Sequence, residues 1–403
     1  MKTAIWLYLF LFVAFFDLHA QYPMLTPFAV SLGAAPSFIG LVMGMYSLTH
    51  LPGNLIAGIA VDRRGSRLFI VFSLIGAGIL LLFQARVTDP WQLLYIRSLS
   101  GFVLAFLSPA CMSLLARLAK NHIQQGKLMA GNGLVHTIAS VVSPAAGALL
   151  AAKLGFSQSF ALLGWILLIT GILSFWFVKE PVPVAHPETG GTAPGQPVSP
   201  AAAKLDAPDP LLQSPAAGFS WSVFVLPIGM ACAQGILAFE LPLRGTDAAT
   251  IMSTGILFSV ISLGSLVTLS LLFLNRYLPY LRTVVGVMLL AICYYGLASD
   301  WPVSLLVLLF AAGMAKGVIF PAMTSFLLQL SGPTRYGRTF SILSISLSIG
   351  SFLGPVAAGA VRSYFSPYFL SFLALMIALV FLFPREAFKA NWNPNGALPP
   401  HAH

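Results

Sequence analysis

Long apolar stretches, separated by short polar segments, recur along almost the whole chain. A helix needs about twenty apolar residues to cross the hydrocarbon core of a bilayer, and the stretches have this length. Only helices and closed barrels satisfy every backbone group in lipid, and the alternating pattern of barrel strands is absent. The pattern therefore predicts an all-α polytopic membrane protein with twelve transmembrane helices, at residues 4–30, 36–60, 67–87, 91–117, 125–152, 156–178, 221–245, 250–274, 280–299, 301–330, 336–362 and 366–384.

The composition agrees with this pattern. Of the 403 residues, 58% are hydrophobic and only 8% are charged, which excludes a water-exposed globular surface. The three cysteines fall within predicted spans and have no metal-ligand spacing, so they are expected to be packing residues without a disulfide framework. Lys2, the apolar run after it and the tripeptide before Gln21 also resemble a signal peptide, whose removal would leave eleven spans.

The basic residues predict the orientation. With twelve spans, both termini and the long central loop lie on one side. That side would carry Lys2, Arg63, Arg64, Arg67, Arg117, Lys120, Lys127, Lys179, Lys204, Arg276, Arg282, Arg335, Arg338, Arg385 and Lys389, and the other side Arg86, Lys153, Arg244 and Arg362. The positive-inside rule then places both termini in the cytoplasm of a multi-pass protein of the cell inner membrane. Contact between basic loops and anionic membrane lipid accounts for the net charge of +10, so no nucleic-acid partner is expected.

The chain is predicted to consist of two similar halves. Residues 181–218 are rich in Pro, Ala and Gly and are expected to form a flexible cytoplasmic linker. It separates an N-terminal six-helix half, 1–180, from a C-terminal half, 219–385, which a cytoplasmic tail, 386–403, follows. Pro144 and Pro355 occupy equivalent places at an offset of 211 residues, which indicates a duplicated unit. Parallel repeats of this kind place a transport site between the halves, near the bilayer midplane.

The loop after the second span carries the most specific motif. It reads Gly58-Ile59-Ala60-Val61-Asp62-Arg63-Arg64-Gly65-Ser66-Arg67. Gly58 is expected to allow close helix approach, Asp62 to cap or pair across helix ends, and Gly65 to permit a tight turn. The equivalent loop of the second half has lost the acid and the glycine. The first loop resembles the signature of the major facilitator superfamily, which implies a gating role for Gly58, Asp62, Arg63, Gly65 and Arg67.

Two further motifs support this resemblance. Arg97 and Gly101 in the fourth span resemble the second motif of the superfamily, in which a buried arginine is implicated in proton transfer. Ser143, Pro144 and Gly147 resemble the helix-bend motif of antiporters, although Ser143 replaces the usual glycine, and Gly354 and Pro355 form a closer copy in span 11. Apart from transport, small residues beside a proline also permit a kinked, closely packed helix. The resemblance is closest to the drug:proton antiporter branch and implies two pseudo-symmetric six-helix bundles.

Four charged residues lie inside the predicted spans, namely Asp17, Arg97, Glu240 and Lys316 on spans 1, 4, 7 and 10. In the family fold these spans line the central cavity, and charges at membrane depth are expected to face it or each other. With a rise of 1.5 Å per residue, Asp17 lies about 20 Å from one end of its span and Arg97 about 9 Å from the opposite face. In a core about 30 Å thick these depths coincide, so the two are expected to pair in one state of the cycle. Asp17, Arg97 and Glu240 are the candidates for proton coupling, with a permanently paired anchor as the alternative for Asp17 and a solvated mouth residue for Glu240.

The other candidates are polar or aromatic. Gln21 lies four residues after Asp17 and so on the same helical face. His19 points away from that face, which favours a packing hydrogen bond, and His136 is ambiguous between packing and substrate contact. Lys316 is expected to contact a substrate anion or to extend toward the cytoplasm. Together with Phe239, these residues, Gln21, His19, His136 and Lys316, form the predicted substrate cavity.

The predicted function is proton-coupled secondary export of a small amphipathic or hydrophobic compound by alternating access. Flipping of a lipid or glycolipid, and proton-coupled symport of a metabolite or sugar, are the alternatives. No metal-ligand cluster, nucleophile elbow or phosphate-binding glycine loop is present in the sequence, so we expect neither enzyme activity nor a metal or cofactor. The expected partners are the small-molecule substrate, protons and membrane lipid, and the protein is expected to be a monomer.

Overall fold

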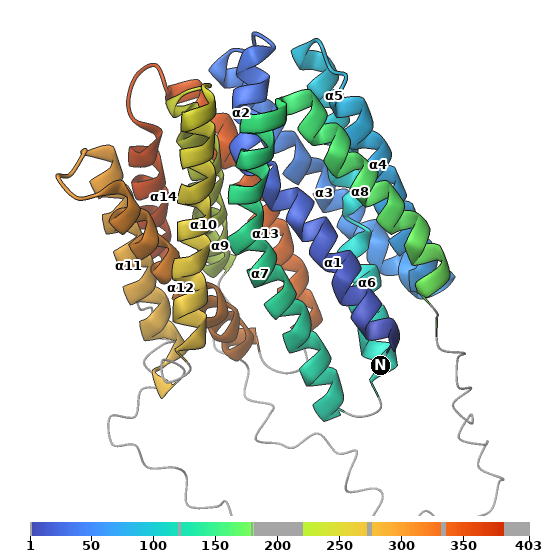
Figure 1. The fold of residues 1–403 in the computed structure, drawn as a ribbon. Helices are drawn as coiled ribbons and strands as arrows, with labels where there is room; N and C mark the ends of the chain where they lie inside the picture. Colours follow the sequence, from blue (N-terminus) through green and yellow to red (C-terminus); the bar gives the residue numbers. More distant parts are fainter. Residues whose placement is uncertain are drawn as a thin grey trace, which may run out of the picture.

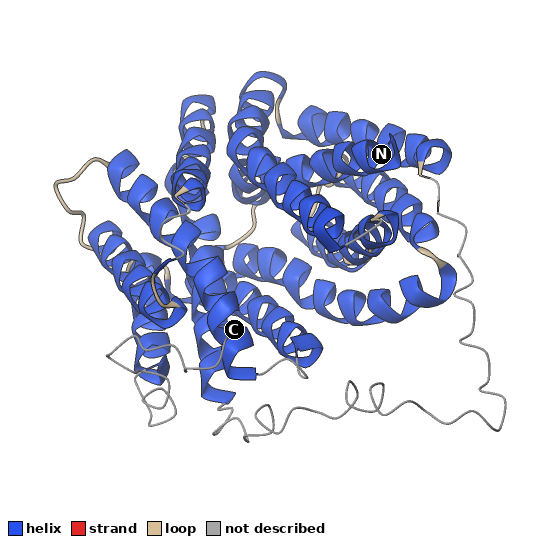
Figure 2. Ribbon diagram, turned by 90° about the horizontal axis from the view of Figure 1, so that it is seen from below, coloured by secondary structure: helices blue, strands red, loops and turns tan. Residues whose placement is uncertain are grey.

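The structure is a computed structural model, and it describes residues 2–119, 122–178, 180, 221–271, 276–331 and 336–382. All the regular structure in these ranges is helical, which confirms the predicted fold class (Figures 1 and 2). The predicted linker, 181–218, and the predicted tail, 386–403, lie outside the described residues.

The helices of the first half run from the N-terminus to Phe177. They are α1 (Lys2–Ala20), α2 (Tyr22–Ser31), α3 (Pro36–Arg64), α4 (Ser66–Gln84), α5 (Pro90–Leu104), α6 (Leu107–Leu118), α7 (His122–Leu154) and α8 (Phe156–Phe177). The second half contains η2 (Trp221–Phe224), α9 (Val225–Glu240), η3 (Leu241–Arg244), α10 (Ala248–Ser270), α11 (Pro279–Ala298), α12 (Leu305–Ser331), α13 (Tyr336–Val361) and α14 (Pro367–Leu382).

Ten helical stretches of the described chain are long and apolar enough to cross a membrane. The 29-residue α3 and the apolar, 16-residue α14 complete the series of twelve. Two predicted spans are broken rather than continuous. Span 1 consists of α1 and α2, and span 4 of α5 and α6. Each break precedes a proline, Pro23 or Pro109, because a proline ring clashes with the carbonyl four residues earlier and lacks an N–H.

Equivalent contacts in the two halves bear out the internal repeat. Gly101 on α5 lies against the backbone of α3, where an added Cβ would be 2.2 Å from the carbonyl oxygen of Tyr46. Gly313 on α12 lies in the same way against α10, where the corresponding distance to the Ile261 carbonyl oxygen is 2.0 Å. The two glycines are 212 residues apart, within one residue of the offset that relates Pro144 to Pro355, and neither position has room for a side chain.

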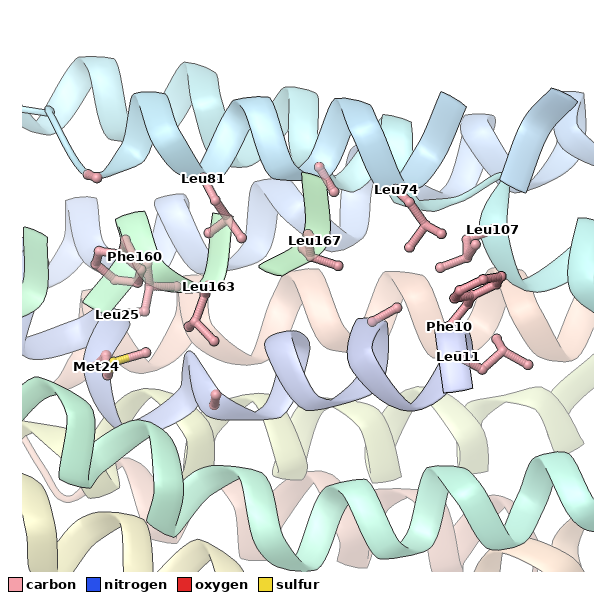
Figure 3. Close-up of a cluster of buried hydrophobic side chains, with 14 of the residues drawn as sticks. Phe10, Leu11, Met24, Leu25, Leu74, Leu81, Leu107, Phe160, Leu163 and Leu167 are labelled. Atoms are coloured by element: carbon pink, nitrogen blue, oxygen red, sulfur yellow. The ribbon is translucent and has the colours of Figure 1, made fainter. Parts of the chain in front are cut away.

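The buried apolar side chains form two clusters, the first mainly in the N-terminal half and the second in the C-terminal half. In the first half, leucines of α4 and α8 face each other beside α1, and Figure 3 shows Leu74, Leu81, Leu163 and Leu167 together with Phe10. A second cluster, which includes the fully buried Leu226, Val287, Leu309 and Leu375, joins α9, α11, α12 and α14. The first cluster also includes Ile236, Phe239, Ile251 and Ala358 of the second half, so the apolar packing continues across the interface between the halves.

The halves meet mainly through two helix pairs, α3 with α13 and α7 with α10, and α2 also contacts α10 and η3. An added Cβ on Gly40 would lie 2.2 Å from the carbonyl oxygen of Pro355, and one on Gly255 would lie 2.6 Å from that of Pro144. We call the end of the molecule that carries residue 2 the N-terminal face. The contacts between the halves lie near the opposite face. Toward the N-terminal face α7 diverges from α10 and α12 (Figure 1). The halves are therefore joined at one face.

Candidate functional site

The site is built around the break in span 1. Helix α1 ends at Ala20, Gln21 forms a turn, and α2 continues from Tyr22. The Gln21 carbonyl accepts backbone hydrogen bonds from Met24 at 3.1 Å and from Leu25 at 2.8 Å. Across the break, Gly147 of α7 lies so close that an added Cβ would be 2.3 Å from the Ala20 carbonyl oxygen. The interrupted helix is thus held against α7 at the level of Gln21.

Gln21 joins the two charges that were expected to pair. Its Nε2 donates to both carboxylate oxygens of Asp17 at 3.0 Å, and its Oε1 accepts from Nη1 of Arg97 at 2.8 Å. All three side chains are buried, with exposed fractions of 2%, 5% and 7% for Asp17, Gln21 and Arg97. The expected direct pair is therefore replaced in this structure by a bridge, because the Gln21 amide lies between the carboxylate and the guanidinium.

The surroundings of Arg97 complete this network. Its guanidinium carbon lies 4.7 Å from the centre of the Tyr46 ring on α3, a cation–π contact. Gln84 of α4 also approaches the Oε1 atom of Gln21, at 3.5 Å. The Nε atom of Arg97 is buried without a hydrogen-bond partner among the residues that the structure describes. Helices α1, α3, α4 and α5 thus converge on one buried acid–amide–guanidinium array.

A second cluster contains both candidate histidines. The Nδ1 atom of His19 lies 2.7 Å from the Phe15 carbonyl oxygen, so Nδ1 carries the proton and donates within α1. The rings of His19 and His136 lie 5.2 Å apart, edge to face, and His136 makes the same kind of contact with Phe15 at 4.7 Å. His19 thus makes a hydrogen bond within its own helix, while its ring packs against α7 and Tyr22.

Lys316 approaches this cluster from the second half. It is half-buried on α12, and its positive charge acts on both His19 and His136. By contrast, Phe239 on α9 of the second half is fully buried in the cluster that it shares with the first half, and it does not line an open space in this structure.

Glu240 lies apart from these groups. It forms an ion pair with Arg362, whose Nε lies 2.9 Å from Oε2, near the face opposite to the N-terminal face. Beside it is a cavity of about 280 Å³ whose lining includes Arg244, Asp300 and Tyr368. Arg362 follows α13 directly and was expected to be a loop charge, so its pairing with Glu240 was not predicted. Glu240 and Asp17 therefore do not share one site.

The loop motif is held in place by Glu180, which is not one of the motif residues. Gly65 has φ +86°, in agreement with the expected tight turn. The exposed Glu180, after α8, accepts backbone hydrogen bonds from Ser66 and, at 2.8 Å, from Arg67 at the first turn of α4. Arg67 lies over the Phe175 ring at 4.8 Å and donates to the Phe175 carbonyl. A carboxylate at a helix N-terminus is favoured by the helix dipole and by the free N–H groups.

The expected close approach at Gly58 is not found. In the described part of the chain, no atom outside the neighbouring turns of α3 lies within 4 Å of the place where its Cβ would be. The reason is that α3 meets α13 near the opposite face, so the end of α3 that contains Gly58 is exposed. Arg63 is also exposed, and the side chain of Asp62 lies outside the described part of the chain.

The helix-bend residues are packing positions at the centre of the molecule. The Ser143 hydroxyl donates to the Ala139 carbonyl within α7, and Ser259 Oγ of α10 accepts from the Ala145 amide at 3.2 Å. In the second half, an added Cβ on Gly354 would lie 2.3 Å from the Cys232 carbonyl oxygen. The residues around Pro144 therefore bring α7 close to α10 across the interface. Those around Pro355 bring α13 close to α9 within the second half.

Comparison with known proteins gives consistent results. The family model described as Major Facilitator Superfamily matches residues 7–299 and 283–400. The chain is 27% identical over 377 residues to the multidrug resistance protein MdtG of Salmonella paratyphi A (strain ATCC 9150 / SARB42), covering 90% of this chain and 88% of the relative. The protein of that name from Salmonella typhi is 26% identical over the same length and coverage.

Solved structures share the fold at low sequence identity. A bacterial homologue of the human lysosomal transporter Spinster, in an inward-facing and occupied conformation, superposes with a TM-score of 0.74 at 15% identity. That comparison covers 97% of this chain and 98% of the other. A mutant of the peptide transporter POT in complex with alafosfalin gives a TM-score of 0.73 at 16% identity, over 94% and 93% of the two chains.

Proposed function

The chain belongs to the major facilitator superfamily, and we propose that it exports small amphipathic or hydrophobic compounds in exchange for protons. As a member it is a secondary transporter with several membrane spans and not an enzyme. The printed name of the Salmonella relatives, multidrug resistance protein, supports export. We place the N-terminal face in the cytoplasm, in accord with the distribution of basic residues, and the protein in the inner membrane.

The observation that carries the coupling proposal is the buried carboxyl of Asp17. A charge at membrane depth is costly, so an unpaired carboxylate would take up a proton. Here Gln21 donates to both carboxylate oxygens and at the same time accepts from Arg97, which stabilises the ionised form. An amide can satisfy an anion and a cation together because it has both a donor and an acceptor end.

Protonation changes this arrangement directly. A neutral Asp17 needs only one acceptor and attracts the Gln21 amide less, so the bridge to Arg97 weakens. Gln21 forms the turn between α1 and α2, and the contact of Gly147 with Ala20 holds that turn against α7. A proton on Asp17 thus acts beside the contact between Ala20 and α7. Helix α7 is in turn one member of the pair α7–α10 that joins the halves.

The arrangement of the halves supports the assignment of a state. The close backbone contacts between α3 and α13, and between α7 and α10, lie near the face opposite to the N-terminal face. With the N-terminal face in the cytoplasm, this is the state that is closed toward the outside. Rocking of the halves would break these contacts and bring the exposed end of α3, with Gly58, against the second half.

Flux in proteoliposomes with an imposed pH gradient tests the proposal, with a panel of dyes, antibiotics and lipids. The wild type should move at least one amphipathic compound faster with the gradient than without it. Asp17→Asn is neutral and nearly isosteric, and it should retain substrate counterflow but lose the acceleration by the gradient. Glu240→Gln is the matched control at another intramembrane acid, and its flux should still be accelerated by the pH gradient. Full gradient-driven flux in Asp17→Asn would rule out Asp17 as the proton carrier, and flux of lipids alone would favour flipping.

A further inference from the structure

We infer that the transported compound carries an anionic group, and that this group binds between Lys316 and His136. The inference rests on the proposed export function and names the class of its substrate. It starts from the balance of charges within the membrane-spanning part of the described chain.

Three of the four intramembrane charges are compensated. Asp17 and Arg97 share the Gln21 amide, and Glu240 is paired with Arg362. Lys316 is the exception, since neither a hydrogen bond nor an ion pair links it to any described residue. Among the residues that the structure describes, no carboxylate acts on its charge. A buried or half-buried ammonium without a counter-charge is unfavourable, so its site is suited to an anion that arrives from outside the chain.

The position of Lys316 favours a substrate contact over extension toward the cytoplasmic surface. Its charge reaches His19 on α1 and His136 on α7, which belong to the other half. His19 is only two residues from the break at Gln21. Helix α10 packs against both α12, which carries Lys316, and α7, which carries His136. We therefore assign the ammonium group to the space between the halves, which is where a carrier of this architecture binds its cargo.

His136 supplies a second donor for the anion. The residue is exposed on α7 and has no hydrogen bond to another described residue, so either ring nitrogen can carry the proton. The rings of Phe15 and His19 contact it edge to face at 4.7 and 5.2 Å and fix its orientation. Nδ1 of His19 is itself engaged with the Phe15 carbonyl, which leaves His19 as a positioning residue rather than the donor.

Aromatic side chains beside the two histidines fit an apolar body. Tyr22 contacts His19 at 5.4 Å and Phe258 of the second half at 5.8 Å, both measured between ring centres. Phe15 adds a half-buried ring on the same stretch of α1. A compound with an aromatic or aliphatic body and one carboxylate, sulfonate or phosphate would therefore match the site from both halves.

Equilibrium binding to the full-length protein in detergent tests this assignment without a pH gradient. Three probes share one ring system and differ in charge: naphthalene-1-sulfonate, (1-naphthylmethyl)ammonium and 1-naphthalenemethanol. Calorimetry should show that the wild type binds the sulfonate about tenfold more tightly than the alcohol and binds the ammonium compound most weakly. Lys316→Gln should remove this preference and leave the affinity for the alcohol unchanged, whereas Lys316→Arg should retain it.

Further variants separate the site from general effects of charge. Lys153→Gln removes an exposed lysine at the end of α7 and should bind like the wild type. His136→Leu should weaken binding of the sulfonate severalfold, and His136→Gln, which keeps an N–H donor, should restore most of it. Equal affinity of the wild type for the three probes, or an anion preference that survives Lys316→Gln, would overturn the inference.

Two additional comparisons distinguish a soluble anion from a lipid headgroup, and failure of this inference from failure of the proposed function. Short-chain phosphatidylglycerol is added as a competitor, and displacement of the sulfonate at lipid concentrations near the Kd of the probe would assign the site to a lipid headgroup instead of a soluble anion. Because binding is measured without a gradient, loss of proton coupling in Asp17→Asn leaves the result intact. Conversely, absence of an anion preference would not affect gradient-driven flux of another compound.

Discussion

Replacement of Gln21 by leucine tests the bridge between Asp17 and Arg97 directly. Leucine has a similar size but can neither donate nor accept, so the carboxylate of Asp17 loses two donor contacts of 3.0 Å. Hydrogen bonds to charged groups stabilise by about 1.5–3 kcal/mol. The variant should therefore hold its proton more tightly, and the midpoint of the pH dependence of transport should move upward by about one to two pH units.

The assay is counterflow of the fastest compound from the liposome panel, measured at equal pH on both sides over a pH series. Gln84→Leu is the matched control, because Gln84 approaches Gln21 at 3.5 Å without contacting Asp17. Its midpoint should remain within about 0.3 of the wild-type value, a shift worth about 0.4 kcal/mol. An unchanged midpoint in Gln21→Leu would refute the bridging role. A shift to lower pH would do the same, since it would mean that Arg97 reaches Asp17 directly.

Two further variants address the loop and the distant ion pair. Glu180→Ala leaves the first N–H groups of α4 without their acceptor and should lower the free energy of unfolding by about 1 kcal/mol, read as a lower Tm in detergent, while the exposed Arg63→Gln should not. Equal melting of both variants would contradict this anchoring. Arg362→Gln leaves the half-buried Glu240 unpaired and should cost about 1–2 kcal/mol, between the values for exposed and buried pairs. The double variant with Glu240→Gln should cost less than the sum of the two, and strict additivity would exclude coupling between them.

Much of the fold follows from local sequence properties. Span length and the repeat depend on hydropathy and spacing, so the series of helices and the equivalence of Gly101 and Gly313 could be predicted. The contact of Gln21 with Asp17 follows from helical spacing of four residues. The break after Ala20 could have been inferred from Pro23, because the effect of proline on the preceding turn is local.

The contacts that were missed depend on rotation about helix axes and on segments far apart in the chain. Depth along a span placed Asp17 and Arg97 at one level, yet it carries no information about which side chain lies between them. Glu180 meets Ser66 across 114 residues, and no local pattern signals that approach. The expectation for Gly58 failed for a different reason, since its packing depends on which face of the transporter is closed.

The repeat also explains how the proposed proton site can communicate with the interface. Gly40 against Pro355 and Gly255 against Pro144 are equivalent contacts between the halves, one from each repeat. Pro144 is three residues before Gly147, which contacts the carbonyl of Ala20 beside the break in span 1. No side chain fits at either glycine of α7 and α10, so movement of one backbone must displace the other. A rearrangement of Gln21 after protonation of Asp17 therefore acts on α7, and through α7 on one of the two helix pairs that form most of the interface between the halves.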